Sequence, residues 1–256
     1  MARINWDQDG ERLYETGVSR GVLYLKETTG EYGEGVAWNG LSAANSSPDG
    51  AEPTDIFADN IKYLSLMSAE NHNGTIEAYT YPDEFAIADG SYTLAPGLNV
   101  GQQSRREFGL SYSSILGNDI EEDMYGEKIH LVYGAKASPS ARDRGTVNDT
   151  PEAVTFSWEY TTTPVVIDYI TVNGKSLKPS AYLEIDSTKV SEGAFAEIKR
   201  ILYGASDTEP RLPHIAEVLS IMSEGTLSSD IKINTDALPA DLQSLFPEVE
   251  YPLGDD

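Results

Sequence analysis

Cysteine is absent from the 256 residues of this chain, and basic residues are few. Without cysteine, disulfide bonds, thiolate nucleophiles and zinc–thiolate sites are all excluded. Eighteen Lys and Arg residues stand against 42 Asp and Glu residues, which leaves a formal net charge of −24. Binding to a phosphate backbone requires clustered cations, so the composition argues against nucleic-acid binding and against an anionic membrane surface. A charge of this size also serves solubility.

Long apolar runs are missing as well. No stretch approaches the roughly eighteen consecutive apolar residues that a membrane-spanning helix requires. The first ten residues, Met1–Gly10, contain no apolar core of the kind found in secretory signal peptides. We therefore expect a chain that folds in the cytoplasm and does not contact a membrane. Apolar residues make up 39% of the chain, which is enough to bury a sizeable core.

Catalytic and ligand-binding motifs are also missing. The sequence has no GxSxG nucleophile elbow and no glycine-rich phosphate loop. Asp7–Gly10 begins like a calcium loop, but the twelfth position of such a loop would be Val18 instead of Glu. Glu121–Asp123 could serve acid–base chemistry or hold a cation, although a solvated turn is the simpler interpretation. The three histidines, which show no metal-ligand spacing, are His72, His130 and His214. We expect no enzyme activity, no metal and no cofactor.

What the sequence does contain is a series of short alternating runs. In Val154–Thr161, apolar side chains recur at every second residue, and Ile129–Ala137 has a second apolar set at its odd positions. Asn173-Gly174 is the clearest signal for a two-residue hairpin. Short strands joined by polar turns predict a mainly antiparallel β-sandwich or barrel. Shorter strand candidates are Gly21–Lys26, Lys62–Ser68, Thr75–Tyr81, Arg106–Ser113 and Ala181–Asp186.

Helical signals are few in the first part of the chain and more frequent later. A proline followed by two acidic residues predicts one short helix over Asp83–Asp89. Later, apolar residues recur at helical spacing, with a helix-end signal at Gly204 and a helix-start signal at Pro213. We therefore expect a β domain over residues 1–190 and a partly helical extension over residues 191–256 that ends in an acidic tail.

Two segments rich in Gly, Pro, Asn and Ser predict long loops, Asn39–Asn60 and Ala137–Pro151. Loops of this length are uncommon in compact domains and usually have a function. The first loop carries Ile56 and Phe57, which either fold back onto their own sandwich or anchor in another subunit. The second interpretation makes both residues candidate inter-subunit contacts.

Arg105 and Arg106 are the only adjacent arginines of the chain. They could pair with carboxylates of their own chain or with those of a neighbouring subunit. In so acidic a chain, pairing between subunits is attractive, and both arginines are therefore candidate inter-subunit contacts.

Several stretches, taken together and in this order, resemble the major tail proteins of siphophages, especially those that infect Gram-positive hosts. These stretches cover roughly residues 11–190, whereas residues 191–256 match the family only loosely. They are ETGVSRGVLY from Glu15, VAWNGL from Val36, GTIEAYTYPDEF from Gly74, GQQSRREFGLSY from Gly101, GND from Gly117, KIHLVYG from Lys128 and SWEYTTTP from Ser157.

The resemblance implies a β-sandwich of the tail-tube type with one flanking helix. In this family six subunits form a ring whose inner strands join into a continuous barrel, and rings stack into the tail tube. The implied partners are further copies of the chain and the tape-measure, tail terminator and baseplate proteins. Assembly would take place in the host cytoplasm, and the final location would be the tail of the virion. DNA would pass through the lumen without specific binding, which gives the acidic charge a second interpretation.

Two other classes of function remain open. A soluble β-sandwich binding module, for example for carbohydrate, could use Trp38, Trp158 and tyrosines as a platform for sugar rings. Alternation places Trp158 on the same apolar face as Val154 and Phe156, which favours a core position instead. A hydrolase based on carboxylates is supported by composition alone.

Overall fold

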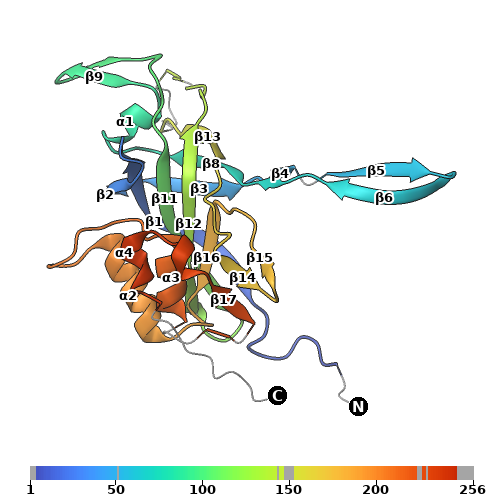
Figure 1. The fold of residues 1–256 in the computed structure, drawn as a ribbon. Helices are drawn as coiled ribbons and strands as arrows, with labels where there is room; N and C mark the ends of the chain where they lie inside the picture. The colour runs from blue at the N-terminus through green and yellow to red at the C-terminus, as the bar shows by residue number, and fades with distance from the viewer. Residues whose placement is uncertain are drawn as a thin grey trace.

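The chain folds into a β body that carries helices on one side and a long hairpin on another (Figure 1). In the computed structural model, strands account for 46% of the chain and helices for 13%, and the sheets are antiparallel. The prediction of a mainly antiparallel β protein is confirmed. The residues that the structure describes are 4–50, 52–142, 144–146, 153–223, 227–228 and 230–246.

A large sheet forms the body. Its strands are β1 (Tyr14–Lys26), β2 (Tyr32–Trp38), β3 (Leu41–Ser46), β8 (Asn73–Ala78), β11 (Phe108–Asn118), β12 (Glu122–Ala137), β13 (Phe156–Thr162) and β16 (Tyr182–Asp186). The strand order is β2-β1-β11-β12-β13-β8-β3, and β16 pairs with β12 beside this path. β3 lies at one end of this order but also contacts β1 near the other end. The sheet therefore curls toward a barrel.

The long strand β12 changes one of its pairing partners at Gly134. It pairs with β16 before this glycine, over Lys128–Val132, and with β13 after it, over Ala135–Ala137. Gly134 has a φ of +61°, a conformation that glycine adopts readily. Opposite it, β11 advances two residues while β12 advances three, which defines a β-bulge.

This bulge changes which face the side chains of β12 occupy. Ile129 and Tyr133 belong to the core under the helices, whereas Ala135 and Ala137 belong to the core on the opposite face. The expectation that the odd positions of Ile129–Ala137 form a single apolar face is therefore wrong. An extra residue in the strand moves every later side chain to the other face.

The inner core lies on the face of the sheet away from the long helices. The short helix α1 (Phe85–Ala88) contributes to it and falls inside the predicted range Asp83–Asp89. Trp158 is 1% exposed and Trp38 is 3% exposed, so both indole rings are core residues. Other buried members are Leu23, Ile76, Phe108, Leu110, Tyr112, Val132 and Tyr160.

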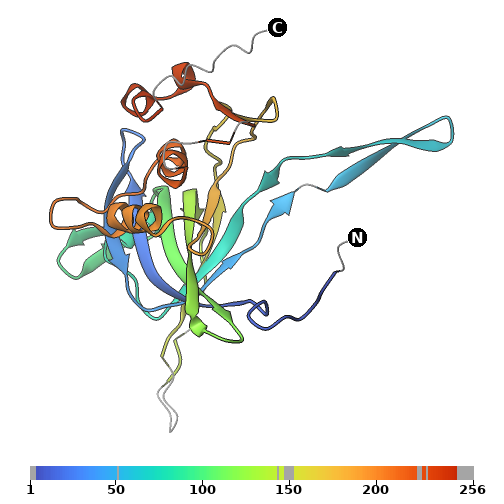
Figure 2. The ribbon, with the colours of Figure 1, turned by 90° about the horizontal axis from the view of Figure 1, so that it is seen from below.

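The outer core lies between the sheet and two helices, α2 (Glu192–Tyr203) and α3 (Ile215–Met222). Both helices lie where the spacing of apolar residues predicts them. Their buried residues pack with Tyr24 from β1 and Leu131 from β12. Helices that follow residue 190 thus share a core with strands that precede it (Figure 2).

A small second sheet contains β14 (Ile170–Val172), β15 (Lys175–Ser176) and β17 (Ile231–Ile233). Asn173 and Gly174 both have positive φ and close the hairpin between β14 and β15, as predicted. A 3₁₀ turn, η1 (Thr235–Ala237), and the helix α4 (Ala240–Gln243) follow. The expected acidic tail lies outside the described residues. Among the helices of the described ranges, none is long and apolar enough to span a membrane.

The segment predicted as a loop over Asn39–Asn60 is instead mostly strand, and that prediction is wrong. It contains β3, β4 (Asp49–Gly50) and the first strand and turn of a ribbon that projects away from the body in both views (Figures 1 and 2). A projecting ribbon has solvent on both faces, so its sequence need not alternate like a core strand. The other predicted loop, Ala137–Pro151, has no helix or strand in the described residues after β12, and its last part lies outside them.

Candidate functional site

The projecting ribbon, which we call the arm, consists of β5 (Pro53–Ala58) and β6 (Ile61–Met67). β4 and β7 (Glu70–Asn71) pair with each other between the arm and the paired strands β3 and β8. Asp59 and Asn60 form the tip, with φ values of 51° and 65°, as a two-residue turn of type I′ requires. At about 3.3 Å per residue, six residues carry the arm roughly 20 Å beyond its base.

One face of the arm is uncharged and mostly apolar. Cross-strand pairs share a face, and Ile56 pairs with Leu64 while Ala58 pairs with Ile61. The alternate residues Thr54 and Leu66 lie on this same face. The exposed fractions are 40% for Ile56, 37% for Leu64, 64% for Ile61 and 56% for Leu66. Water therefore reaches a continuous strip of large apolar side chains.

The opposite face of the arm is mixed: the exposed apolar side chains of Phe57, Tyr63 and Met67 lie on it beside a group of polar ones. Asp55 accepts a hydrogen bond from the hydroxyl of Ser65 and forms an ion pair with Lys62 at 2.7 Å. These bonds place the three side chains on one face. Phe57 follows Asp55 by two residues and shares that face, where it is 69% exposed.

Isolated two-stranded hairpins are marginally stable in water, and they require a third strand or a packed apolar face. Within the part of the chain that the structure describes, the apolar face of the arm has neither. An exposed apolar strip of this kind marks an interaction site in soluble proteins. The arm is therefore the first candidate functional site.

A second hairpin, which we call the short ribbon, consists of β9 (Tyr92–Ala95) and β10 (Leu98–Val100). Thr93 pairs with Asn99 and donates a hydrogen bond to its side-chain oxygen at 2.7 Å, which defines a polar face. The other face collects only apolar side chains, all of them exposed. They are Tyr92, Leu94, Leu98 and Val100.

The arm and the short ribbon lie on opposite sides of the body. Figure 1 shows the arm extending to the right and β9 at the upper left, and Figure 2 keeps the two apart. Neither apolar face can therefore cover the other within one chain.

The structure places the two predicted anchors, Ile56 and Phe57, on the arm but on opposite faces. Consecutive residues of a strand point in opposite directions, so only Ile56 belongs to the apolar face. Neither residue folds back onto the body. Their contact with another subunit stays a prediction.

Arg105 and Arg106 have partners inside their own chain. Arg105 donates to the carbonyl oxygen of Ala137 at 3.2 Å and lies 3.7 Å from a carboxylate oxygen of Asp89. Arg106 lies 3.6 Å from a carboxylate oxygen of Glu27. Pairing within the chain was one of the two alternatives that the sequence left open for these arginines. An inter-subunit role for either arginine stays a prediction.

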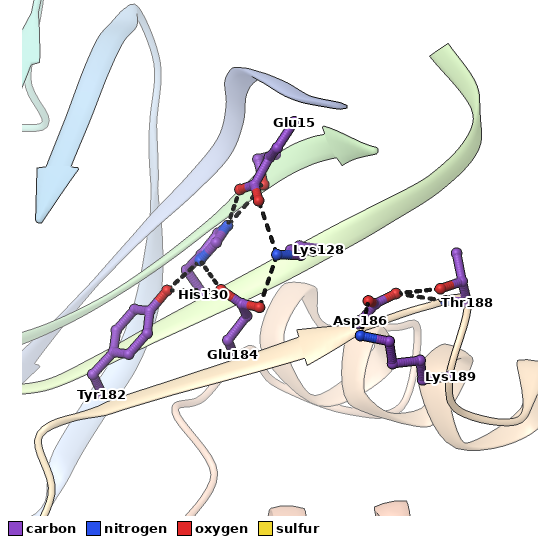
Figure 3. Close-up of polar contacts among 9 residues, drawn as sticks. Glu15, Lys128, His130, Tyr182, Glu184, Asp186, Thr188 and Lys189 are labelled. Carbon is purple, nitrogen blue, oxygen red and sulfur yellow. Dashed lines mark hydrogen bonds and ion pairs between the residues drawn. The ribbon is translucent and has the colours of Figure 1, made fainter. Parts of the chain in front are cut away.

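A cluster of polar side chains on the large sheet contains a lysine, a histidine and two glutamates, which are residue types found in acid–base sites (Figure 3). Lys128 lies 2.9 Å from a carboxylate oxygen of Glu15 and 2.9 Å from one of Glu184. It thereby ties β1 to β16 across β12. Two hydrogen bonds hold the pKa of Glu15 below its ordinary value even though partial burial alone would raise it. No local sequence pattern marks this cluster, because its members lie on three separate strands.

The imidazole of His130 lies beside this lysine. The Ser114 hydroxyl donates to Glu15 at 2.6 Å, so its oxygen is free to accept from Nε2 of His130 at 2.8 Å. Nδ1 lies 2.6 Å from the Tyr182 hydroxyl, which also lies 3.4 Å from a carboxylate oxygen of Glu184, and it accepts from this hydroxyl when the proton points to the nearer partner. A neutral imidazole satisfies both contacts. Burial lowers the pKa of His130, although Glu15 and neighbouring Glu184 act to raise it.

Ser114, His130 and Glu15 do not have the geometry of a catalytic triad. In a triad the carboxylate binds the imidazole nitrogen that faces away from the serine, and the serine hydroxyl is open to substrate. Here Tyr182 occupies that nitrogen and Glu15 binds the serine itself. Ser114 is 5% exposed. The contacts of this cluster instead connect four strands of the sheet, β1, β11, β12 and β16.

Stability should decrease as the pH falls below about 6.5, the ordinary pKa of histidine. A histidine whose pKa is lowered by folding binds protons more readily in the unfolded chain, so acidification favours unfolding. His130, His72 and His214 all have a lowered pKa because of burial. Urea unfolding at pH 7.5, 6.5 and 5.5 measures the slope, and His130→Gln should make it shallower. Parallel slopes in the variant and the wild type would contradict a neutral, buried His130.

The remaining sequence candidates have structural positions. His72 stacks on Tyr182 with ring centroids 4.6 Å apart, and His214 accepts from the backbone N–H of Ala216 at the start of α3. In the exposed run Glu121–Asp123, Glu121 ends the turn after β11, and the other two residues begin β12. No group of three or more metal-ligating side chains occurs within the described ranges. Trp38 and Trp158 are buried, so neither can serve as a platform for sugar rings.

Comparison with protein-family models yields no match for this chain, and comparison with curated proteins yields none either.

Proposed function

We propose that this chain is a structural subunit of the tail tube of a long-tailed phage. Subunits would assemble into rings, six-fold by the resemblance to siphophage major tail proteins, and the rings would stack into a conduit for the genome. Tape-measure, tail terminator and baseplate proteins would be the further partners. The proposal includes no enzyme activity, no cofactor and no contact with a membrane.

The observation that carries the proposal is the apolar face of the arm. A ribbon that projects from the body with its apolar face in water is explained if a second copy covers that face. The antiparallel body adds support, because β2 and β3 end the strand order of the sheet and neither pairs with a further strand among the described residues. Joining such edges between subunits removes a site of uncontrolled pairing.

The acidic composition is compatible with a conduit for DNA. A surface that repels phosphate lets a duplex slide past without binding. The same charge opposes assembly, because a six-fold ring would collect 6 × 24 = 144 formal negative charges. At 0.1 M salt, exposed charges are screened beyond about 10 Å. Assembly should therefore be assayed across a salt series.

Negative-stain microscopy of the purified chain tests the proposal directly. We expect rings or tubes, and we expect a variant in which Pro53–Met67 is replaced by a short Gly/Ser turn to lose them. This variant should remain a soluble monomer with a cooperative melt, because the arm contributes no residue to either core.

Asp55→Asn combined with Ser65→Ala changes only the polar face of the arm and is the matched control. It should assemble like the wild type. A wild-type chain that stays monomeric at every salt concentration would contradict the proposed function. Normal tubes from the armless variant would show that another surface drives assembly.

A further inference from the structure

We propose that the apolar face of the arm packs on the apolar face of the short ribbon of the next copy. This inference rests on the proposed function, because it specifies which two surfaces of identical subunits meet. The contact is head to tail: each copy presents its arm to one neighbour and its short ribbon to the other.

The two faces match in chemistry. Each is one side of a two-stranded antiparallel ribbon, and neither carries a charged side chain. Two β-ribbons can stack face to face at about 10 Å, with side chains interdigitating as they do between the layers of a sandwich. Each ribbon thus acquires the second apolar layer that its own chain does not supply.

Electrostatics favours the short ribbon as the receiving surface. Copies that each carry a charge of −24 repel one another, so contact is least unfavourable where the surface is uncharged. The segment Tyr92–Val100 contains no Asp, Glu, Lys or Arg, although such residues make up 23% of the chain. The arm presents its charged pair, Asp55 and Lys62, on the opposite face.

The positions of the two ribbons determine the kind of assembly. A two-fold dimer with arm against arm would leave the short ribbon uncovered. Contact between two different patches on opposite sides of one subunit is heterologous, and such contacts close into rings or continue as filaments. Closed rings that stack and a continuous helical filament are both compatible with a tube.

Engineered cysteines test the contact, and the absence of native cysteine removes any background. One variant carries a cysteine on the apolar face of the arm, Leu64→Cys or Leu66→Cys. A second carries one on the short ribbon, Leu94→Cys or Leu98→Cys. The variants are mixed in equal amounts under assembly conditions, treated with a bifunctional maleimide whose spacer is about 10 Å long, and separated on a denaturing gel.

We expect at least one of the four mixtures to form a covalent dimer at a yield several times that of either variant treated alone. Layers that stack at about 10 Å hold facing Cα atoms beyond the roughly 7 Å that a disulfide allows, so a linker of matching length reports the contact. The matched control is Ser65→Cys with Thr93→Cys, which places both thiols on the polar faces and should give no dimer. Cooperative melting of each variant confirms that it is folded.

Crosslinking of an arm variant with itself would overturn the inference in favour of a two-fold contact. Absence of crosslinks in all mixtures, while the wild type forms tubes, would also overturn it and leave the proposed function standing. Crosslinked mixtures from a wild type that forms neither rings nor tubes would support the contact and contradict the tube.

Discussion

Replacing Trp158 with alanine is expected to lower the free energy of unfolding by about 3–5 kcal/mol, the usual cost of deleting a large aromatic side chain from a core. The indole is 1% exposed and packs edge-on against Phe85 and Trp38 at centroid distances of 5.1 and 5.7 Å. Its Nε1 also donates to a carboxylate oxygen of Asp89 at 3.1 Å. The substitution therefore leaves both a cavity and a carboxylate with one donor fewer.

Trp6→Ala is the matched control for this prediction, because Trp6 is 76% exposed. It should change the free energy of unfolding by no more than about 0.5 kcal/mol. Urea unfolding followed by circular dichroism measures both variants on one scale. Similar midpoints for the two would contradict the assignment of Trp158 to the core. A stable Trp158→Ala variant that had lost affinity for a sugar would favour the binding-module hypothesis instead.

Gly134→Ala should be the other strongly destabilising change, by roughly 2–6 kcal/mol. A residue other than glycine at this positive φ costs about 1–3 kcal/mol in backbone strain. The added Cβ would also lie 2.3 Å from the carbonyl oxygen of Thr163, and overpacking of this kind costs about 1–3 kcal/mol more. Thr163 cannot move away freely, because its N–H donates to the carbonyl oxygen of Gly134 at 2.9 Å.

Gly174→Ala separates these two contributions. Gly174 also has a positive φ, of +75°, but an added Cβ would meet nothing within 4 Å. The free energy of unfolding of the Gly174→Ala variant should fall only by the cost of placing a residue with a Cβ in the left-handed conformation, about 1–2 kcal/mol. Equal decreases in the free energy of unfolding at the two positions would show that only backbone strain contributes and that the structure relaxes to relieve the contact with Thr163. Urea midpoints of both variants decide between these outcomes.

Local sequence patterns were sufficient to predict most of the elements. Alternation of apolar and polar residues located β13 and β16, because the two faces of a half-buried strand meet different environments. Asn173-Gly174 predicted its hairpin, since these residues tolerate the positive φ that the turn requires. Helical spacing and Gly204 located α2 and its end for equally local reasons.

Only one strand of the arm was predicted: the candidate Lys62–Ser68 corresponds to β6, whereas β5 was taken as part of a loop. Gly, Pro, Asn and Ser are frequent in Asn39–Asn60, and a ribbon with solvent on both faces lacks the alternation that marks a core strand. The sequence did single out Ile56 and Phe57 as candidate inter-subunit contacts. That they face opposite sides of a ribbon depends on the pairing of β5 with β6, and a segment taken as a loop has no faces to assign.

The sequence by itself determined that this chain is a mainly antiparallel β protein with late helices and a strongly acidic surface. These properties follow from composition and from contacts between near neighbours in the chain. Only the tertiary structure decided where β12 changes its partner at Gly134, and that Glu15, Lys128 and Glu184 meet. It alone placed two apolar ribbons on opposite sides of the body. Each of these depends on residues far apart in the chain, and the register between distant strands is set by their packing and not by local propensity.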